Sequence, residues 1–260
     1  MAKSSPTKTS TTNTPNSKEE SSEMDKNSPA LQLGKFLTRN KDSHFNFEEG
    51  INWFVSTGSL NLDSAIGGGI EPGILRHAGA PSAGKTSEAL EIVRNFFATV
   101  PNSWAVYVKT EGRLSKKVQE RSGLKFTTDF EKWGPGVVFI LETNIYETII
   151  ELMRELVRDN PSKCRYCFIL DSVDMVNLKN DFIKKIEDGV KVGGSPLMTK
   201  QFLQKTALEF SKKGHLGIYI SQKSAEIKLS QYEKGAGRQV DGAGGNALQH
   251  LATYVFEFID

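Results

Sequence analysis

One short loop constrains the fold of this chain more than any other feature of its sequence. Residues 79–86 have the pattern G-x-x-x-x-G-K-T, in which glycines let backbone N–H groups curl around the phosphates of a nucleoside triphosphate. The pattern needs a strand before it and a helix N-terminus after it. Residues 74–78 are typical of a short strand, and the apolar residues after the loop recur at helical spacing. The sequence therefore predicts a phosphate site formed by Gly79, Ala80, Pro81, Ser82, Ala83, Gly84, Lys85, Thr86 and Ser87.

Strand and helix patterns alternate along the rest of the chain. Strands are expected at 104–111, 136–143, 164–171 and 216–222, helices at 115–121, 146–160 and 198–214, and a short helix with a last strand at 247–259. Such alternation is typical of an α/β fold in which a mostly parallel twisted sheet carries helices on both faces. The near-continuous apolar runs of these strands also fit a sheet that is buried on both sides.

The first residues differ in composition from the remainder. Residues 1–30 are rich in Ser and Thr and contain no aromatic side chain. Such a segment cannot bury enough apolar surface to offset the entropy of ordering, so we expect a disordered tail. Residues 31–50 are expected to form an arm with a short helix over 31–42, and residues 51–260 a nucleotide-binding core. Packing on its own domain and docking on another subunit both fit the pattern of the arm.

The formal net charge of +2 is too small to indicate a partner by itself. If nucleic acid binds, the basic residues that contact it must be gathered locally. The sequence has no apolar run of about 18 residues, and its N-terminus has no apolar segment typical of a secretory signal. We therefore expect a cytoplasmic protein with no membrane partner.

The two cysteines, Cys164 and Cys167, have a C-x-x-C spacing that raises the question of a redox pair or half of a zinc site. They fall in a predicted strand, where an odd spacing points two side chains to opposite faces. The chain has no second C-x-x-C to complete a metal site. The spacing thus favours two thiols in a buried strand over a chemical site.

Three polar residues stand where predicted strands end. Glu111, Asp171 and Gln222 each follow an apolar run. The carboxyl ends of neighbouring parallel strands meet at the ligand, so these side chains are expected near the phosphate loop. Asp171 is expected to hold a metal ion together with Thr86, and Glu111 to activate water. On position alone, the alternatives are a helix-capping role for Asp171 and a solvated strand end for Glu111.

Two long loops that contain glycine, 179–196 and 223–245, carry the local basic residues. Loops of this length in compact domains are usually functional or disordered. Their basic residues include Lys191, Lys223, Lys228, Lys234 and Arg238, but both loops also contain acidic residues. Composition alone therefore favours two solvated surface loops over two loops that bind the phosphate backbone of a nucleic acid.

Six segments, in this order, resemble the ATPase core of RecA-type recombinases of phage or bacterial type. They are VSTGSLNLD (55–63), the phosphate loop, Glu111, FILDSV (168–173), SQ (221–222) and GGNAL (244–248), and the resemblance covers roughly residues 51–260. It implies ATP and Mg²⁺ as cofactors, with catalytic roles for Lys85, Glu111 and Gln222. It also implies that Thr86 and Asp171 hold the metal and that Gln222 couples the γ-phosphate to the second loop.

The resemblance further implies a partner and an assembly. In the family the two loops bind DNA, which gives that role to Lys191, Lys223, Lys228, Lys234, Arg238, Gly244, Gly245 and Asn246. The family forms helical filaments on single-stranded DNA and promotes homologous pairing and strand exchange in recombination and repair. The alternative is a non-catalytic ATP-binding relative that acts as a recombination mediator or regulator.

The sequence departs from the family pattern near the base and beyond the core. Ser115 and Val118 stand where the family usually has Asp and Tyr beside adenine, and Lys109 stands where Asp is frequent. The family's further strands and C-terminal domain have no counterpart up to Asp260. The resemblance therefore implies the ATPase core, with adenine contacts that differ from those of the family.

Overall fold

The computed structural model describes residues 28–47, 50–112, 114–179, 194–225, 239–241 and 245–259. The chain divides into two compact units, Met1–Phe47 and Glu48–Asp260. The helices and strands of the second unit are α2 (Leu60–Ala65), β1 (Gly73–Gly79), α3 (Lys85–Thr99), β2 (Ser103–Lys109), α4 (Lys116–Ser122), β3 (Lys125–Thr127), β4 (Val137–Glu142), α5 (Tyr146–Arg158), β5 (Arg165–Asp171), α7 (Gly194–Lys213), β6 (Leu216–Ala225), β7 (Gln239–Asp241), α8 (Gly245–Leu251) and β8 (Tyr254–Phe258). The described residues of this unit also form the short 3₁₀ helices η2 (Phe130–Lys132) and η3 (Val173–Met175).

The first unit contains one α-helix, α1 (Pro29–Arg39), followed by the 3₁₀ helix η1 (Lys41–Ser43) within the part that the structure describes. The Ser28 hydroxyl accepts a hydrogen bond from the backbone N–H of Leu31, which caps the N-terminus of α1. α1 therefore begins inside the last residues of the predicted tail. Residues 1–27 of that tail lie outside the described residues.

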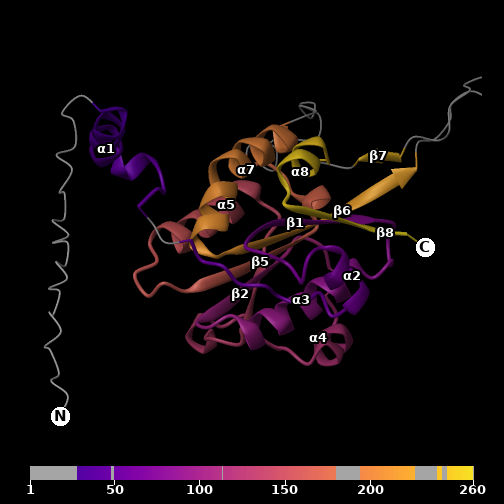
Figure 1. The fold of residues 1–260 in the computed structure, drawn as a ribbon. Helices are drawn as coiled ribbons and strands as arrows, with labels where there is room; N and C mark the ends of the chain where they lie inside the picture. The colour runs from indigo at the N-terminus through magenta and orange to yellow at the C-terminus, as the bar shows by residue number, and fades with distance from the viewer. Residues whose placement is uncertain are drawn as a thin grey trace, which may run out of the picture. The chain divides into compact units, whose positions relative to one another are not determined.

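The second unit is built around an eight-stranded sheet whose main part is parallel (Figure 1). Its strands follow the order β3-β4-β2-β5-β6-β1-β8, and every neighbouring pair along this path is parallel. β7 lies off this path and pairs with the end of β6 in the antiparallel sense. The predicted α/β fold with a mostly parallel sheet is confirmed.

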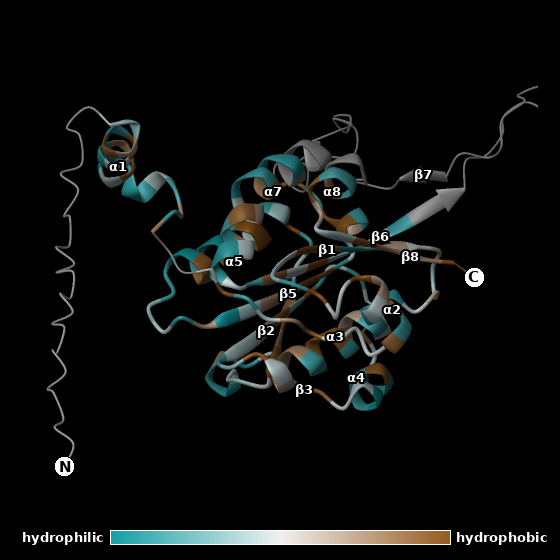
Figure 2. Cartoon of the chain, in the orientation of Figure 1, coloured by the Kyte–Doolittle hydropathy of each residue, from teal (hydrophilic) through white to brown (hydrophobic). Residues whose placement is uncertain are grey.

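Helices cover both faces of the sheet, and each face has its own hydrophobic core. α2, α3 and α4 lie on one face, where α3 buries Ala89, Val93 and Phe96 (Figure 1). α5, α7 and α8 lie on the other, where Met153 and Phe210 are buried. Figure 2 shows hydrophobic residues along the central strands and hydrophilic residues on the outer turns of the flanking helices. In the described parts of the chain, no helix combines the length and apolar character that crossing a membrane requires.

The two cysteines lie as their spacing predicts. Cys164 packs in the core beside α5 and α7, Cys167 packs in the core beside α3, and both are free thiols. Burial raises the pKa of Cys167 well above its usual value, so this thiol stays neutral. No group of three or more His, Cys, Asp and Glu side chains in the described ranges could hold a metal ion. Both cysteines are therefore core residues.

Three helices and strands of the described part of the second unit, α2, β3 and β7, are not predicted by the sequence pattern; β7 lies in the segment 223–245, for which a loop is expected. β3 spans only three residues, too few to show the alternation of a strand, and it forms by pairing with β4. α2 is a short helix within the segment 55–63 and the residues just after it. Its N-cap is Ser59, whose hydroxyl accepts a hydrogen bond from the backbone N–H of Leu62.

β8 approaches β1 so closely that the first glycine of the phosphate loop has a packing role of its own. Gly79 pairs with Phe258, and a Cβ atom on Gly79 would lie 2.4 Å from the carbonyl oxygen of Phe258. On the same strand, His77 is fully buried and its ring stacks on Phe256. Its Nδ1 lies 3.1 Å from the carbonyl oxygen of Lys85 and donates to it. The end of β1 is therefore fixed to both β8 and α3.

Two buried histidines make the folded unit sensitive to acid. Burial lowers the pKa of His77 to about 4, and burial with the nearby charges of Arg165 and Lys213 lowers that of His215 to about 3. In an unfolded chain a histidine titrates near about 6.5, so below that pH the unfolded chain takes up protons that the folded chain does not. As the pH falls from about 6.5 toward the folded pKa of each histidine, that histidine lowers the free energy of unfolding by up to about 1.4 kcal/mol for each pH unit.

Replacing His215 by Asn removes one of these groups, while the new side chain can still accept the backbone N–H of Tyr166, which lies 3.1 Å from Nδ1. We expect urea unfolding between about pH 7 and pH 5 to show a smaller acid loss for His215→Asn than for the wild type. His77→Asn should flatten the same slope. Identical slopes in all three proteins would contradict this account.

Candidate functional site

The parallel register brings the ends of β1, β2 and β5 to one edge of the sheet, beside Gln222 of β6, a strand that continues to Ala225. Gly79 at the end of β1 pairs with Gln222 on β6, and Asp171 at the end of β5 pairs with Lys109 on β2. β5 and β6 are themselves neighbours, and Glu111 follows β2 by two residues. The three polar residues that the sequence marks therefore lie side by side, next to the phosphate loop. The predicted end of a strand at Gln222 is wrong, because β6 continues to Ala225, where it pairs with β7.

The phosphate loop turns sharply between β1 and α3. Ser82 and Gly84 have φ angles of 67° and 97°, and Gly84 is the N-cap of α3 in the left-handed conformation that favours glycine. α3 runs for 15 residues, so its first turn offers backbone N–H groups and about half a positive charge to an anion. The buried Lys85 side chain folds back along the loop and donates to the carbonyl oxygens of Gly79, at 2.9 Å, and Ala80, at 2.6 Å. Positive charge is thus concentrated at the helix N-terminus.

Asp171 connects α3, β5 and β2 at this edge. Its Oδ2 accepts hydrogen bonds from the hydroxyl of Thr86, at 2.7 Å, and from the hydroxyl of Tyr107. Burial, and then the charge of Asp171, raises the pKa of Tyr107 well above its usual range, so the phenol stays protonated and donates. Thr86 and Asp171 present oxygen ligands of the kind that Mg²⁺ prefers, so this pair fits the predicted metal.

Glu111 and Gln222 are in contact with each other. The Glu111 carboxylate accepts a hydrogen bond from the Ser172 hydroxyl, and the side-chain amide of Gln222 donates to it at 3.4 Å. The backbone N–H of Gln222 donates to Oδ2 of Asp174 at 2.6 Å. Ser172 directly follows Asp171, so the turn after β5 joins the Glu111 carboxylate to the strand that carries Asp171. A carboxylate and an amide are thereby held together beside the phosphate loop.

A cavity of about 230 Å³ lies at these strand ends. It is lined by Ser82, Gly84, Lys85, Thr86, Ser87, Glu111, Val118, Asp171, Ser172, Ile220 and Gln222. All the residues predicted for catalysis and for the metal are in this lining. Of the predicted nucleotide residues, Gly79, Ala80, Pro81 and Ala83 belong to the loop but do not line the cavity. The cavity therefore joins the loop, both carboxylates and Gln222.

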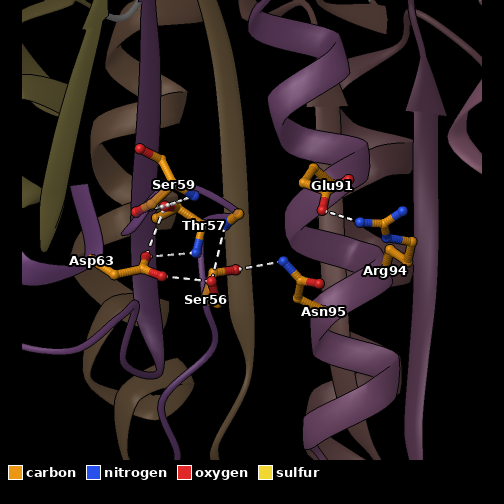
Figure 3. Close-up of polar contacts among 8 residues, drawn as sticks. Ser56, Thr57, Ser59, Asp63, Glu91, Arg94 and Asn95 are labelled. Carbon is orange, nitrogen blue, oxygen red and sulfur yellow. Dashed lines mark hydrogen bonds and ion pairs between the residues drawn. The ribbon is translucent and has the colours of Figure 1, made fainter. Parts of the chain in front are cut away.

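The segment 55–63, which carries part of the family resemblance, does not line this cavity. Asp63 accepts hydrogen bonds from the backbone N–H and the hydroxyl of Thr57, at 2.8 and 2.7 Å, and from the Ser56 hydroxyl (Figure 3). Desolvation opposes the charge on Asp63, but the hydrogen bonds from Ser56 and Thr57 lower its pKa. The Asn95 side chain on α3 donates to the carbonyl oxygen of Ser56 at 3.0 Å. The segment thus ties the start of the core to the helix after the phosphate loop.

The residues predicted to contact DNA follow Gln222 or lie in the first long loop. Lys223 lies on β6, which continues to Ala225 and pairs there with β7. Gly245 and Asn246 open α8. Lys191, Lys228, Lys234, Arg238 and Gly244 lie outside the described residues. A role in DNA binding stays a prediction for the whole set.

Sequence reasoning misses Tyr107, Ser172, Asp174 and Arg76. Arg76 on β1 is fully buried, its Nε donates to the Ser221 hydroxyl at 3.0 Å, and its Nη1 donates to the side-chain oxygen of Gln249 at 2.9 Å. It therefore links the strand of the phosphate loop to the residue before Gln222 and to α8, the helix after the second loop. The signal in the sequence is an arginine inside an apolar strand. A charged side chain in such a strand is buried, and a buried charge needs hydrogen-bonding partners, so Arg76 could have been singled out.

The departures from the family pattern have roles of their own. Lys109 forms an ion pair of 2.8 Å with Glu142 at the end of β4 and does not line the cavity. Ser115 caps α4, since its hydroxyl accepts a hydrogen bond from the backbone N–H of Val118 at 3.3 Å. Val118 itself lines the cavity. An aliphatic side chain therefore stands where the family usually has an aromatic one.

Proteins named RecA are similar to this chain along most of its length. Protein RecA of Syntrophobacter fumaroxidans is 28% identical over 201 residues, which are 76% of this chain and 53% of that protein. The RecA proteins of Rippkaea orientalis and Cytophaga hutchinsonii are each 26% identical, over 200 and 201 residues, covering 76% of this chain and 52% and 51% of their own lengths. The chain thus spans about half the length of the curated relatives it matches. No family model matches the chain.

Removing the Tyr107 hydroxyl tests how the Asp171 carboxylate is supported. Tyr107→Phe takes one hydroxyl donor from a buried carboxylate, so we expect the free energy of unfolding to fall by about 1–3 kcal/mol. Tyr219→Phe is the matched control, because it removes a buried hydroxyl whose contact is the Met153 sulfur at 4.0 Å. Urea unfolding of the three proteins measures both losses. Equal losses in the two variants would contradict a particular role for Tyr107.

Proposed function

The chain is a distant homologue of RecA proteins and has the core of that RecA-type family, and on this premise we propose that it is a DNA-dependent ATPase. We further propose that it forms filaments on single-stranded DNA and promotes homologous pairing and strand exchange in the cytoplasm of a bacterial or phage-infected cell. The observation that carries the proposal is the cavity in which Lys85, Thr86, Asp171, Glu111 and Gln222 meet.

The phosphate loop and α3 account for triphosphate binding. The N-terminus of α3 offers backbone N–H groups and partial positive charge, and the Lys85 ammonium adds a full charge beside it. Thr86 and Asp171 would hold Mg²⁺, since a hydroxyl and a carboxylate already meet there at 2.7 Å. Bound Mg²⁺ would neutralise part of the phosphate charge. These groups together supply the positive field that a triphosphate needs.

We assign to Glu111 the role of proton acceptor during hydrolysis. The Ser172 hydroxyl orients its carboxylate. As the oxygen of a water molecule bonds to the γ-phosphorus and the bond to the bridging oxygen breaks, Glu111 takes the proton of that water. The Gln222 amide, 3.4 Å from Glu111, is placed to hydrogen-bond with the γ-phosphate or the water. The step yields ADP and inorganic phosphate.

The same glutamine supports a link from ATP to DNA. Gln222 and Lys223 are consecutive residues of β6, and this strand continues into the predicted second DNA-binding loop. Arg76 donates hydrogen bonds to both Ser221 on β6 and Gln249 on α8, so the two elements that flank this loop share one arginine as a partner. We infer that a change at Gln222 is passed to both ends of the loop.

Two substitutions separate ATP binding from hydrolysis. Lys85→Ala removes the charge of the phosphate loop, so we expect loss of measurable ATP binding by calorimetry. Glu111→Gln keeps an acceptor for the Ser172 hydroxyl but removes the base, so we expect ATP to bind while kcat falls by about 10²- to 10⁴-fold. Glu142→Gln is the matched control, because Glu142 ends the neighbouring strand β4 outside the cavity. Unchanged ATP affinity in Lys85→Ala would show that the nucleotide binds elsewhere.

Single-stranded DNA tests the remainder of the proposal. We expect the ATPase rate of the wild type to rise when single-stranded DNA is added, and light scattering to grow as filaments form. A folded protein that binds ATP but shows neither response is not a filament-forming ATPase. That outcome would favour the alternative of a non-catalytic recombination mediator or regulator.

A further inference from the structure

A cavity of about 510 Å³ lies at the end of β5 that is remote from the phosphate loop. Arg165, which lines this cavity, is the first residue of β5, and Asp171 is the last. Each strand residue adds about 3.3 Å, so the two ends of β5 lie about 20 Å apart. We propose that this cavity is a second anion site, which binds a small molecule that carries two or more linked phosphate groups. The site shares no lining residue with the cavity at the phosphate loop and goes beyond the proposed function.

Cations dominate the lining of this cavity. Of its eight lining residues none is acidic, and five are cations: Arg158, Lys163, Arg165, Lys212 and Lys213. They come from the C-terminal end of α5, from the turn and first residue of β5, and from the C-terminal end of α7. The volume falls in the range of small-molecule sites, roughly 300–1,000 Å³. The cavity therefore has the size and the charge to hold a small anion.

The protein neutralises only part of this positive charge. Arg158 pairs with Asp159 at 3.5 Å, and Lys213 pairs with Glu209 at 2.6 Å. The C-terminal ends of α5 and α7 together add about one negative charge, which favours cations in their last turns. Five cations against two carboxylates and two helix ends leave about two positive charges. A ligand with at least two negative charges would balance them.

Three of the five cations have no carboxylate partner in the parts of the chain that the structure describes. The ammonium groups of Lys163 and Lys212 have no hydrogen bond or ion pair there. Nη1 of Arg165 donates to the carbonyl oxygens of Lys163, at 2.8 Å, and Cys164, at 3.4 Å. Burial lowers the pKa of Arg165, because it opposes the charged guanidinium. A bound anion would offset this loss of solvent.

The residues that carry these cations are held in place by other contacts. The side chain of Asn160 both accepts from the backbone N–H and donates to the carbonyl oxygen of Cys164, each at 2.8 Å. Lys163 has a φ angle of 50°, in the left-handed region. Gly214 ends α7, and a Cβ atom there would lie 3.1 Å from Nε of Arg165, so this arginine packs directly against the helix end. A cavity whose walls are fixed in advance loses less entropy when a ligand binds.

The arrangement of the cations favours phosphate over other anions. A terminal phosphate carries between about one and a half and two negative charges at neutral pH and has three acceptor oxygens that point in different directions. These cations surround one cavity from three elements, so several of them can meet the same phosphate. A nucleic-acid backbone, in contrast, is contacted by cations spaced along a surface. Linked phosphates in a small molecule bring enough charge into one cavity.

The experiment measures binding of tripolyphosphate by calorimetry, in EDTA, to the full chain with Lys85→Ala, which removes the charge of the phosphate loop. In this background Lys163→Asn and Lys212→Gln are combined. Both side chains are exposed, and asparagine tolerates the left-handed conformation at residue 163. Lys116→Gln with Lys117→Gln is the matched control, because these exposed cations line neither this cavity nor that of the phosphate loop. Citrate and a short oligodeoxythymidylate serve as the other two ligands.

We expect the Lys85→Ala chain to bind tripolyphosphate. Lys163→Asn with Lys212→Gln should raise its Kd about tenfold or more, because two charge-assisted contacts are lost. The control pair should leave the Kd unchanged, and citrate should bind more weakly than tripolyphosphate. Arg165→Gln should also raise the Kd, with urea unfolding to show that this half-buried variant is folded.

Four outcomes would overturn the proposal. A Lys85→Ala chain that does not bind tripolyphosphate has no second anion site. Equal weakening by the two pairs of substitutions would show an effect of net charge alone. Citrate that binds as tightly as tripolyphosphate would contradict the preference for phosphate. Weakened binding of the oligonucleotide, with tripolyphosphate unaffected, would assign the cations to nucleic acid. If the wild type fails to bind ATP while tripolyphosphate behaves as expected, the proposed function fails and this site stands.

Discussion

The rest of the site depends on the hydrogen bonds that the buried carboxylate of Asp171 accepts. A buried charge is costly unless donors surround it, and here the donors come from two other elements, Thr86 on α3 and Tyr107 on β2. Satisfying the charge therefore fixes the phosphate-loop helix and β2 against the end of β5. The next residue, Ser172, supports Glu111. The interactions that stabilise the fold at this edge are the same ones that assemble the proposed catalytic groups.

A second constraint acts from the other side of β1. The packing of β8 leaves no room for a Cβ atom at Gly79, and the buried His77 holds β1 to both β8 and α3. Arg76, one residue earlier, reaches β6 and α8. Consecutive residues of this one strand thus bond to the phosphate-loop helix and to the elements that flank the second loop.

Local patterns predict most of the core and part of the site. The loop pattern and the apolar runs predict the parallel sheet, and a parallel sheet brings Glu111, Asp171 and Gln222 to one edge whatever the exact strand order. The contacts of Tyr107 and Ser172 could not be predicted, because their partners lie 64 and 61 residues away and the pairing depends on register. The sequence does not predict β3, because a strand of three residues is too short to show the alternation of apolar and polar side chains. The resemblance picks out the segment 55–63, but only the structure shows that Asp63 holds this segment by hydrogen bonds with Thr57.

A structure of the chain with Mg²⁺ and a non-hydrolysable ATP analogue tests the central claim most directly, that one edge of the sheet is a nucleotide site completed by its neighbouring strands. The account predicts the β- and γ-phosphates on the loop beside Lys85 and the metal beside Thr86 and Asp171. A nucleotide bound elsewhere on the chain would contradict it. A metal held far from Asp171 would contradict it equally.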